Sequence, residues 1–233
     1  MPLRPDGIII AIDGPSGAGK STITRLLAER LGYMQIDTGA MYRAAAFMLA
    51  SADVDLGDLA AVEHFCRNLD IRLEVDSGTQ SVRANGLDVT DQIRTPEMSL
   101  LTSRTSTLKP VREALLKAQQ QMGRRGGVIL EGRDIGTVVF PDAELKFYLN
   151  ASVEERARRR CEELMSKGES VTLAETIADV AQRDRQDSER DIAPLRQAED
   201  AIPIDSSRLS IDEVLVIMVT MCRNKIVSME VSS

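Results

Sequence analysis

The stretch IIIAIDGPSGAGKST, residues 8–22, decides how this chain folds. Its opening apolar run predicts a buried strand, and the residues after it place apolar side chains at helical spacing as far as Gly32, a stop signal. Three glycines separate the strand from the helix, although glycine loses more conformational freedom on folding than any other residue. Some other group must therefore come close to this backbone.

Residues 14–21, GPSGAGKS, match the phosphate-binding pattern G-x-x-x-x-G-K-[ST] at every fixed position. Successive backbone N–H groups and the N-terminus of a helix can wrap a phosphate when side chains stay out of the way. The pattern predicts that Lys20 neutralises the β- and γ-phosphates and that the Ser21 hydroxyl ligates Mg²⁺. The residues expected to bind the donor nucleotide are Gly14, Pro15, Ser16, Gly17, Ala18, Gly19, Lys20, Ser21 and Thr22.

The rest of the chain repeats the alternation of strand and helix. Short apolar runs lie at residues 8–13, 34–37, 128–132, 145–149 and 202–205, and most precede a segment with helical periodicity. This order predicts an α/β fold of the P-loop NTPase type, with a five-stranded parallel sheet covered by helices on both faces. Residues 71–75 and 82–84 instead alternate apolar and polar side chains. The turn signals DSG (residues 76–78) and Asn85-Gly86 lie between such runs, which predicts a small antiparallel β insert.

Composition excludes several classes of function. A net charge of −7 argues against binding a nucleic acid polymer, and an aromatic content of 3% offers no stacking platform. Cys66, Cys161 and Cys222, with His64 as the single histidine, have no zinc-cluster spacing and are expected to be buried, reduced thiols.

No segment predicts a membrane protein. The opening residues lack the architecture of a signal peptide, and the apolar run VLVIMVTMC is shorter than the roughly 20 residues that span a bilayer. That run follows a capping box from Ser210 to Glu213, which predicts a buried helix. We expect a cytoplasmic protein without a membrane partner, and a monomer, since no long exposed apolar stripe is evident.

A phosphate loop alone does not name a reaction, but three further segments indicate a second, acceptor site. DTGAMYR (residues 37–43) and EGRDIGT (residues 131–137) follow predicted strands at the carboxyl end of the sheet, and KPVREALL (residues 109–116) begins a helix. A fourth segment, residues 181–194, is rich in charged residues. Each also has a plainer interpretation, as a surface arginine, an Arg–Asp pair or a solvated helix face.

Taken in order, these segments resemble bacterial cytidylate kinases over nearly the whole chain. DTGAMYR and GRDIGTVVFPDA carry the resemblance most specifically, with DGPSGAGKST, VREALL, ASVEERARRR and the RD…D…R…APL pattern in support. The resemblance implies transfer of the γ-phosphoryl group of ATP to CMP or dCMP. It also implies one kinase domain over residues 1–233, an acceptor-binding region at residues 38–110 that includes the β insert at residues 70–95, and a helical lid at residues 155–192.

The resemblance assigns roles to single positions. It places Ser103, Arg112 and Asp134 on the cytosine, and Arg183 and Asp187 on the sugar. Thr38 stands where the family often has serine, and Glu131 where it often has aspartate. The implied substrate-binding set is Thr38, Arg43, Ser103, Arg112, Arg133, Asp134, Arg183, Asp187 and Arg190, and the implied catalytic set is Lys20, Arg133, Arg190, Arg158 and Arg160, the last two in the lid.

Two other functions stay open on the sequence. One is a kinase for another nucleoside monophosphate or for a small hydroxylated metabolite. The other is a non-catalytic nucleotide-binding regulator that uses the β insert as a partner surface. ADP release in the presence of different acceptors distinguishes these possibilities.

Overall fold

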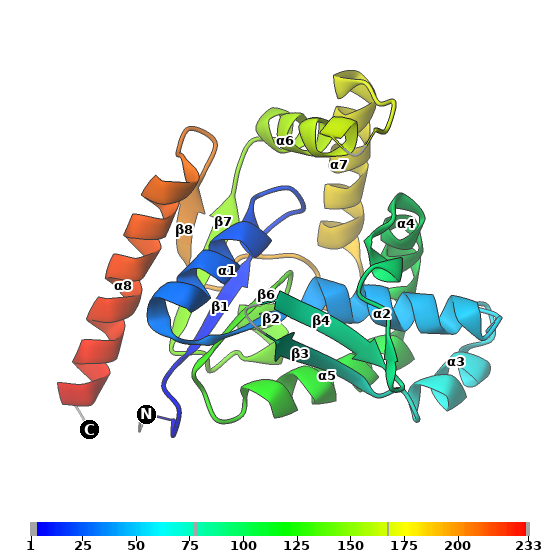
Figure 1. The fold of residues 1–233 in the computed structure, drawn as a ribbon, viewed down its shortest axis with the longest axis horizontal. Helices are drawn as coiled ribbons and strands as arrows, with labels where there is room; N and C mark the ends of the chain where they lie inside the picture. Colours follow the sequence, from blue (N-terminus) through cyan, green and yellow to red (C-terminus); the bar gives the residue numbers. More distant parts are fainter. Residues whose placement is uncertain (1–3, 77–78, 167, 232–233) are drawn as a thin grey trace. The chain divides into compact units, whose positions relative to one another are not determined.

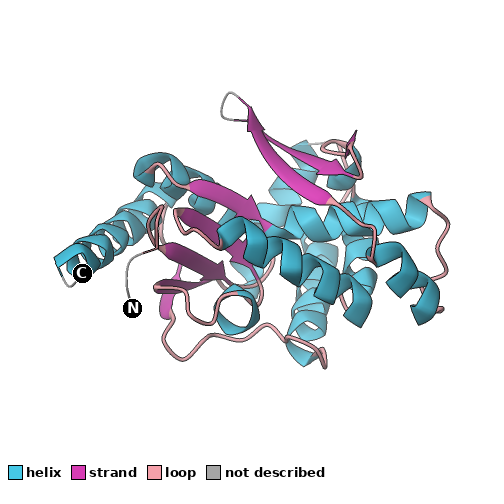
Figure 2. Cartoon of the chain, turned by 90° about the horizontal axis from the view of Figure 1, so that it is seen from below, coloured by secondary structure: helices cyan, strands magenta, loops and turns pink. Residues whose placement is uncertain are grey.

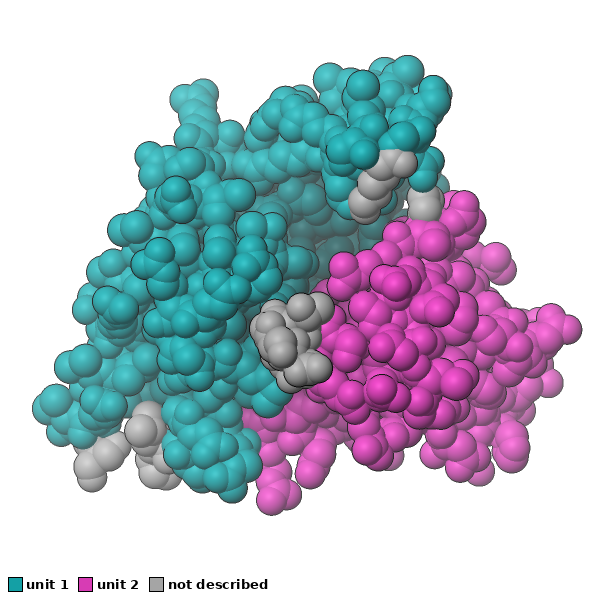
Figure 3. All heavy atoms as spheres, in the orientation of Figure 1, with its two compact units in different colours: residues 1–35, 125–233 teal, residues 36–124 magenta. Residues whose placement is uncertain are grey.

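The computed structural model describes residues 4–76, 79–166 and 168–231 (Figure 1). Helices and strands account for most of these residues (Figure 2). The chain divides into two compact units, Met1–Gln35 with Arg125–Ser233, and Ile36–Arg124 (Figure 3). Each unit is described by itself.

The larger unit is built on a five-stranded sheet, and all five predicted strands are confirmed. The sheet order is β2-β6-β1-β7-β8, and β1 pairs in parallel with both β6 and β7. Adjacent residues of β1 are fully buried whichever face they point to, which is the pattern of a strand covered on both sides. The strands are β1 (Ile9–Asp13), β2 (Met34–Asp37), β6 (Val128–Gly132), β7 (Leu145–Asn150) and β8 (Ile202–Asp205).

Four helices belong to this unit: α1 (Lys20–Leu31), α6 (Val153–Ser166), α7 (Leu173–Glu189) and α8 (Ile211–Val231). Helix α8 packs alongside α1 (Figure 1), and both contribute to one apolar core with Ile10, Ile12 and Phe147 of the sheet. Helix α6 packs against α7. Helix α1 ends where the sequence predicts, because Gly32 adopts a left-handed conformation with φ of 68°.

Helix α8 corrects one expectation. Its capping box is confirmed, since Ser210 Oγ accepts from Glu213 N at 3.2 Å and Ser210 N donates to the Glu213 carboxylate at 2.8 Å. The helix is not buried, however, because only one face enters the core, and Val216 on the other face is 66% exposed. The continuous apolar run is therefore a surface helix that has apolar residues on its exposed face as well as on its buried face.

The smaller unit contains the β insert and four helices. Strands β3 (Ile71–Asp76), β4 (Thr79–Ala84) and β5 (Leu87–Asp88) form the predicted antiparallel sheet, which packs on α2 (Thr38–Ser51). Asn85 and Gly86 join β4 to β5 with φ of 49° and 82°, as a tight hairpin requires. The turn predicted at residues 76–78 falls partly outside the described residues. The remaining helices are α3 (Leu59–Cys66), α4 (Pro96–Thr105) and α5 (Lys109–Gly123), with short helical turns at Gln92–Arg94 and, in the larger unit, Ile135–Val139.

The structure also bears on the expectations for the cysteines and for membrane-spanning helices. All three cysteines are free and buried, as predicted, and His64 lies exposed on α3. Within the described ranges, no helix combines the length and the apolar character needed to cross a membrane.

Candidate active site

The predicted phosphate loop lies between the end of β1 and the start of α1. Gly14, Gly17 and Gly19 all have positive φ angles, of 152°, 79° and 90°. Gly19 caps α1 without a side-chain hydrogen bond, so backbone N–H groups of the first turn point into the loop. This geometry suits an anion.

Glycine occupies these three positions for different physical reasons. A Cβ atom on Gly14 would lie 1.9 Å from the carbonyl oxygen of Leu149, at the end of the neighbouring strand β7. At Gly17 it would lie 3.1 Å from Cβ of Arg156, and at Gly19 it would meet nothing nearer than 3.8 Å. The expectation that the glycines make room for phosphate is therefore incomplete, since Gly14 makes room for a strand.

Lys20 is curled over its own loop. The side chain is buried, with the residue 7% exposed, and Nζ donates to the carbonyl oxygens of Gly14 at 2.8 Å and Pro15 at 2.7 Å. Burial, and next the positive charge of Arg133, lower the pKa of Lys20 to about 7. A phosphate group at this position would restore the ammonium form.

Glu131 is a site residue to which the sequence analysis gave no role. It lies at the end of β6, is 3% exposed, and its carboxylate accepts from Ser21 Oγ at 2.8 Å. The side-chain amide of Gln35 donates to its other oxygen at 3.3 Å. The sequence signal for this residue is an apolar strand that ends in a carboxylate, although a basic residue, Arg133, follows two positions later. Ser21 and Glu131 together supply oxygen ligands of the kind that Mg²⁺ prefers, so this pair fits the predicted ion.

Asp13, the last residue of β1, is a second position that the sequence analysis missed. Its buried carboxylate accepts from the backbone N–H groups of Ile135 at 2.8 Å and Gly136 at 2.7 Å. Burial raises the pKa of Asp13 to about 6 against the opposing effect of these two hydrogen bonds. The carboxylate thereby fixes the turn that directly follows Arg133 and Asp134.

Four of the predicted acceptor residues meet in the larger unit. Arg133 Nε donates to Asp187 at 2.8 Å, and Arg190 lies 3.8 Å from Asp187 and 3.7 Å from Asp134. Burial opposes ionisation of Asp187, but Arg133, Arg183 and Arg190 hold its pKa below its usual value. The charged run around α7 is thus more than a solvated helix face, although Arg185 in the same run is exposed. We call Arg133, Asp134, Asp187 and Arg190 the arginine–aspartate cluster.

The other predicted acceptor residues lie in the smaller unit. Thr38 is buried at the start of α2, and Arg43, one turn later, pairs with Asp37 at 3.1 Å. Arg112 is buried in the first turn of α5, where Nη1 donates to the carbonyl oxygen of Ser106 at 3.2 Å and the guanidinium lies 5.4 Å from the ring centroid of Tyr42. Ser103 is half-buried on α4.

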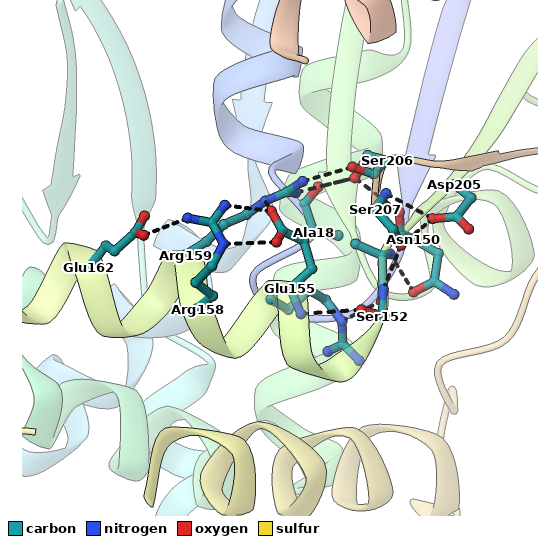
Figure 4. A network of polar contacts seen from close by, with 12 residues as sticks. Ala18, Asn150, Ser152, Glu155, Arg158, Arg159, Glu162, Asp205, Ser206 and Ser207 are labelled. Carbon is teal, nitrogen blue, oxygen red and sulfur yellow. Dashed lines mark hydrogen bonds and ion pairs between the residues drawn. The ribbon is translucent and has the colours of Figure 1, made fainter. Parts of the chain in front are cut away.

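The two predicted lid arginines are held by carboxylates of their own helix. Arg158 is half-exposed and pairs with Glu155 at 2.8 Å and with Glu162, while Arg160 pairs with Glu163 at 2.8 Å (Figure 4 shows Arg158). Two other arginines of α6 contact the phosphate loop or its neighbours. Arg156 Nη1 donates to the Ser16 carbonyl oxygen at 3.1 Å. Arg159 donates to Ser206, whose hydroxyl lies 3.4 Å from the Ala18 carbonyl oxygen (Figure 4).

This arrangement defines a class of protein: a P-loop phosphotransferase, with a phosphate cradle at the carboxyl end of a parallel sheet. Comparison with known proteins makes the class specific. Residues 10–224 match the family model described as Cytidylate kinase. The chain belongs to the cytidylate kinase family, as the sequence resemblance predicted, and is therefore a kinase.

Two cytidylate kinases of other organisms support the same assignment. A cytidylate kinase from Geobacter sp. (strain M21) is 61% identical over 93% of this chain and 93% of its own length. The cytidylate kinase of Bacillus subtilis (strain 168) is 50% identical over 88% of this chain and 92% of its own. A gluconokinase structure from Sinorhizobium meliloti 1021 aligns over 99% of both chains with a TM-score of 0.49 and 14% identity.

Proposed function

We propose that this chain transfers the γ-phosphoryl group of ATP to CMP or dCMP, which yields ADP and CDP or dCDP. The observation that carries the proposal is the arginine–aspartate cluster. Its Arg133 and Asp134 follow directly on strand β6, the neighbour of the strand that carries the phosphate loop, and its Asp187 and Arg190 come from the end of α7. The similarity to proteins named cytidylate kinase supports a cytidylate as the acceptor.

On the donor side, the loop backbone binds the phosphates and Lys20 exchanges its two carbonyl partners for phosphate oxygens. Ser21, with Glu131 behind it, would hold Mg²⁺. When bound, this ion neutralises charge on the β- and γ-phosphate oxygens. The positive charge of Arg133 lowers the pKa of Lys20, so a residue proposed to bind the acceptor affects the protonation of a residue proposed to bind the donor.

On the acceptor side, the arginines orient the nucleoside monophosphate and do not transfer protons. Arg43, Arg133 and Arg190 would bind the phosphate of the monophosphate, with Arg183 and Asp187 at the sugar. Arg112, Ser103 and Asp134 would read the base, because a carboxylate can accept from the exocyclic amine of cytosine. Thr38 completes this set. Phosphoryl transfer depends mainly on such positioning and on charge stabilisation, and we expect direct in-line transfer. Arg158 and Arg160 would join by rearranging when a lid closes on ATP.

Initial rates of ADP release with CMP, dCMP, UMP, AMP and shikimate test the proposal. CMP or dCMP should give the highest kcat/KM. A preference for another monophosphate or for shikimate would reassign the substrate, and no turnover with any of them would favour the regulator. A matched pair of variants tests the site: Arg190→Ala should lower kcat by about 10³-fold, as for arginines that stabilise a migrating phosphoryl group. Arg185→Ala, on the exposed side of the same run, should change it little.

We further propose that the protein works as a monomer in the cytoplasm and has no nucleic acid polymer or membrane as a partner. Light scattering after size-exclusion chromatography should give the mass of one subunit, with and without nucleotides. A dimer mass would contradict this proposal and would make the exposed apolar residues of α8 the candidate interface.

A further inference from the structure

Two carboxylates of α7 connect this helix to the donor loop, through Arg156 of α6, and to the acceptor cluster. Asp184 pairs with Arg156, and Asp187, three residues later, pairs with Arg133. Residues three apart lie on the same side of a helix, so one face of α7 carries both contacts. The arginine–aspartate cluster includes Asp187, but neither the cluster nor the proposed mechanism uses Asp184 or Arg156.

Arg156 is the connection to the donor loop. The residue is only 3% exposed, and its guanidinium makes a bidentate ion pair with Asp184, at 2.9 and 2.6 Å. The same guanidinium donates to the carbonyl oxygens of Ala151 at 2.9 Å and Ser16 at 3.1 Å. Only arginine has the forked set of donors that can satisfy three partners in different directions.

The loop is also packed against the backbone of this arginine. A Cβ atom on Gly17 would lie 3.1 Å from Cβ of Arg156 and 3.2 Å from its carbonyl oxygen. The central residues of the phosphate loop therefore rest directly on the first turns of α6, and the ion pair with Asp184 ties α6 to α7 at the same place. A displacement of α7 must move Arg156, or break an ion pair that is partly buried.

We propose that Asp184 is a positioning residue, which acts through Arg156 to couple the phosphate loop to the arginine–aspartate cluster. Occupation of the cluster by the acceptor's phosphate fixes Arg133 and Asp187, and with them α7. Helix α7 then holds Asp184, Arg156 and the Ser16 carbonyl group in the arrangement that binds the donor. Each nucleotide therefore strengthens the binding of the other, and thermodynamic linkage makes the effect reciprocal. This inference rests on the proposed function.

Calorimetric titration with a non-hydrolysable ATP analogue, with and without saturating CMP, measures this coupling. In the wild type we expect CMP to tighten analogue binding by about fivefold or more, at the lower end of allosteric coupling factors. Asp184→Asn keeps the size of the side chain but removes its charge, and should reduce the factor to below about twofold. Asp179→Asn makes the same charge change at an exposed position of α7 and should leave the factor at its wild-type value.

Arg156→Lys provides a second variant, in case Asp184→Asn fails to fold. Lysine keeps the positive charge but cannot make the bidentate pair and reach Ser16, so it should also lower the factor and raise KM for ATP more than KM for CMP. A wild-type coupling factor in Asp184→Asn or Arg156→Lys would overturn the inference, as would equal losses of affinity for both nucleotides together with a lower Tm. Wild-type turnover with CMP is measured separately, so failure of the proposed function would be recognised independently.

Discussion

Replacing Gly14 with alanine should destabilise the fold itself, and not only the nucleotide site. The new Cβ would lie 1.9 Å from the Leu149 carbonyl oxygen, a backbone atom that no rotamer change can move away. An acceptable contact needs about 3.2 Å, so the ends of β1 and β7 would have to separate by about 1.3 Å. In the native register, Asp13 of β1 pairs with Tyr148 of β7 in that region.

The cost can be estimated from two contributions. Alanine at a φ of 152° is strained, and the separation of the strands disturbs both the ladder and Asp13, which holds the turn after Asp134. Together these effects should lower the free energy of unfolding by about 3–5 kcal/mol, the range of the most damaging single substitutions. For a chain of this length, each kcal/mol corresponds to about 2–4 °C in Tm, so the expected loss is about 6–20 °C.

Thermal and urea unfolding, followed by circular dichroism without nucleotide, measure this loss. Gly19→Ala is the matched control, because Gly19 also has a positive φ but its Cβ would meet nothing nearer than 3.8 Å. That variant should lose only about 1–2 kcal/mol, the strain of a left-handed residue. Both variants should bind ATP poorly, so only stability separates them. If their Tm values agree within about 3 °C, the contact with Leu149 does not explain the glycine.

Three further predictions concern the buried ionisable groups. Because Lys20 has a pKa of about 7, about nine in ten molecules carry a neutral amine at pH 8, and ATP binding should take up about 0.9 proton. Calorimetry in buffers of different ionisation enthalpy measures this proton uptake, and Lys20→Met should abolish it. A binding heat that does not depend on the buffer in the wild type would contradict the prediction. Asp13 has a raised pKa of about 6, so its carboxylate is lost as the pH falls through this value; kcat/KM for the acceptor should decline there, whereas Asp13→Asn should show a low value without that titration. Glu131→Gln removes the charge behind Ser21, and the Mg²⁺ concentration for half-maximal rate should rise by about 10-fold or more; an unchanged Mg²⁺ dependence would separate Glu131 from the ion.

The parts of the fold that the sequence predicted are those with a local cause. Each parallel strand is a short apolar run, and Gly32 and the Ser210–Glu213 box end or begin a helix through contacts within a few residues. The prediction that helix α8 is buried is wrong, because a continuous apolar run does not show which face of the helix packs against the core. Burial on one side depends on α1, nearly 200 residues away in the sequence.

The site residues that the sequence missed have partners far along the chain. Ser21 and Glu131 are 110 residues apart, Asp13 and Gly136 are 123 apart, and Ser16 and Arg156 are 140 apart. No local pattern encodes such pairs, because they arise only when the sheet places β1 between β6 and β7. The motif revealed Lys20 and Ser21, but not the carboxylates and the arginine that hold the loop in place.

The pairing of these charges explains how a chain with a net charge of −7 can present a strongly cationic site. Arg133, Arg190 and Arg156 are each held by an aspartate rather than projecting into solvent. A phosphate that enters such a site meets guanidinium groups that are already held in position, so they lose little side-chain freedom at that moment. Because Arg133 stays paired with Asp187, a phosphate that binds this arginine also fixes Asp187 and the helix α7 that carries it. Recognition of a small anion and fixing of this helix are therefore parts of one event.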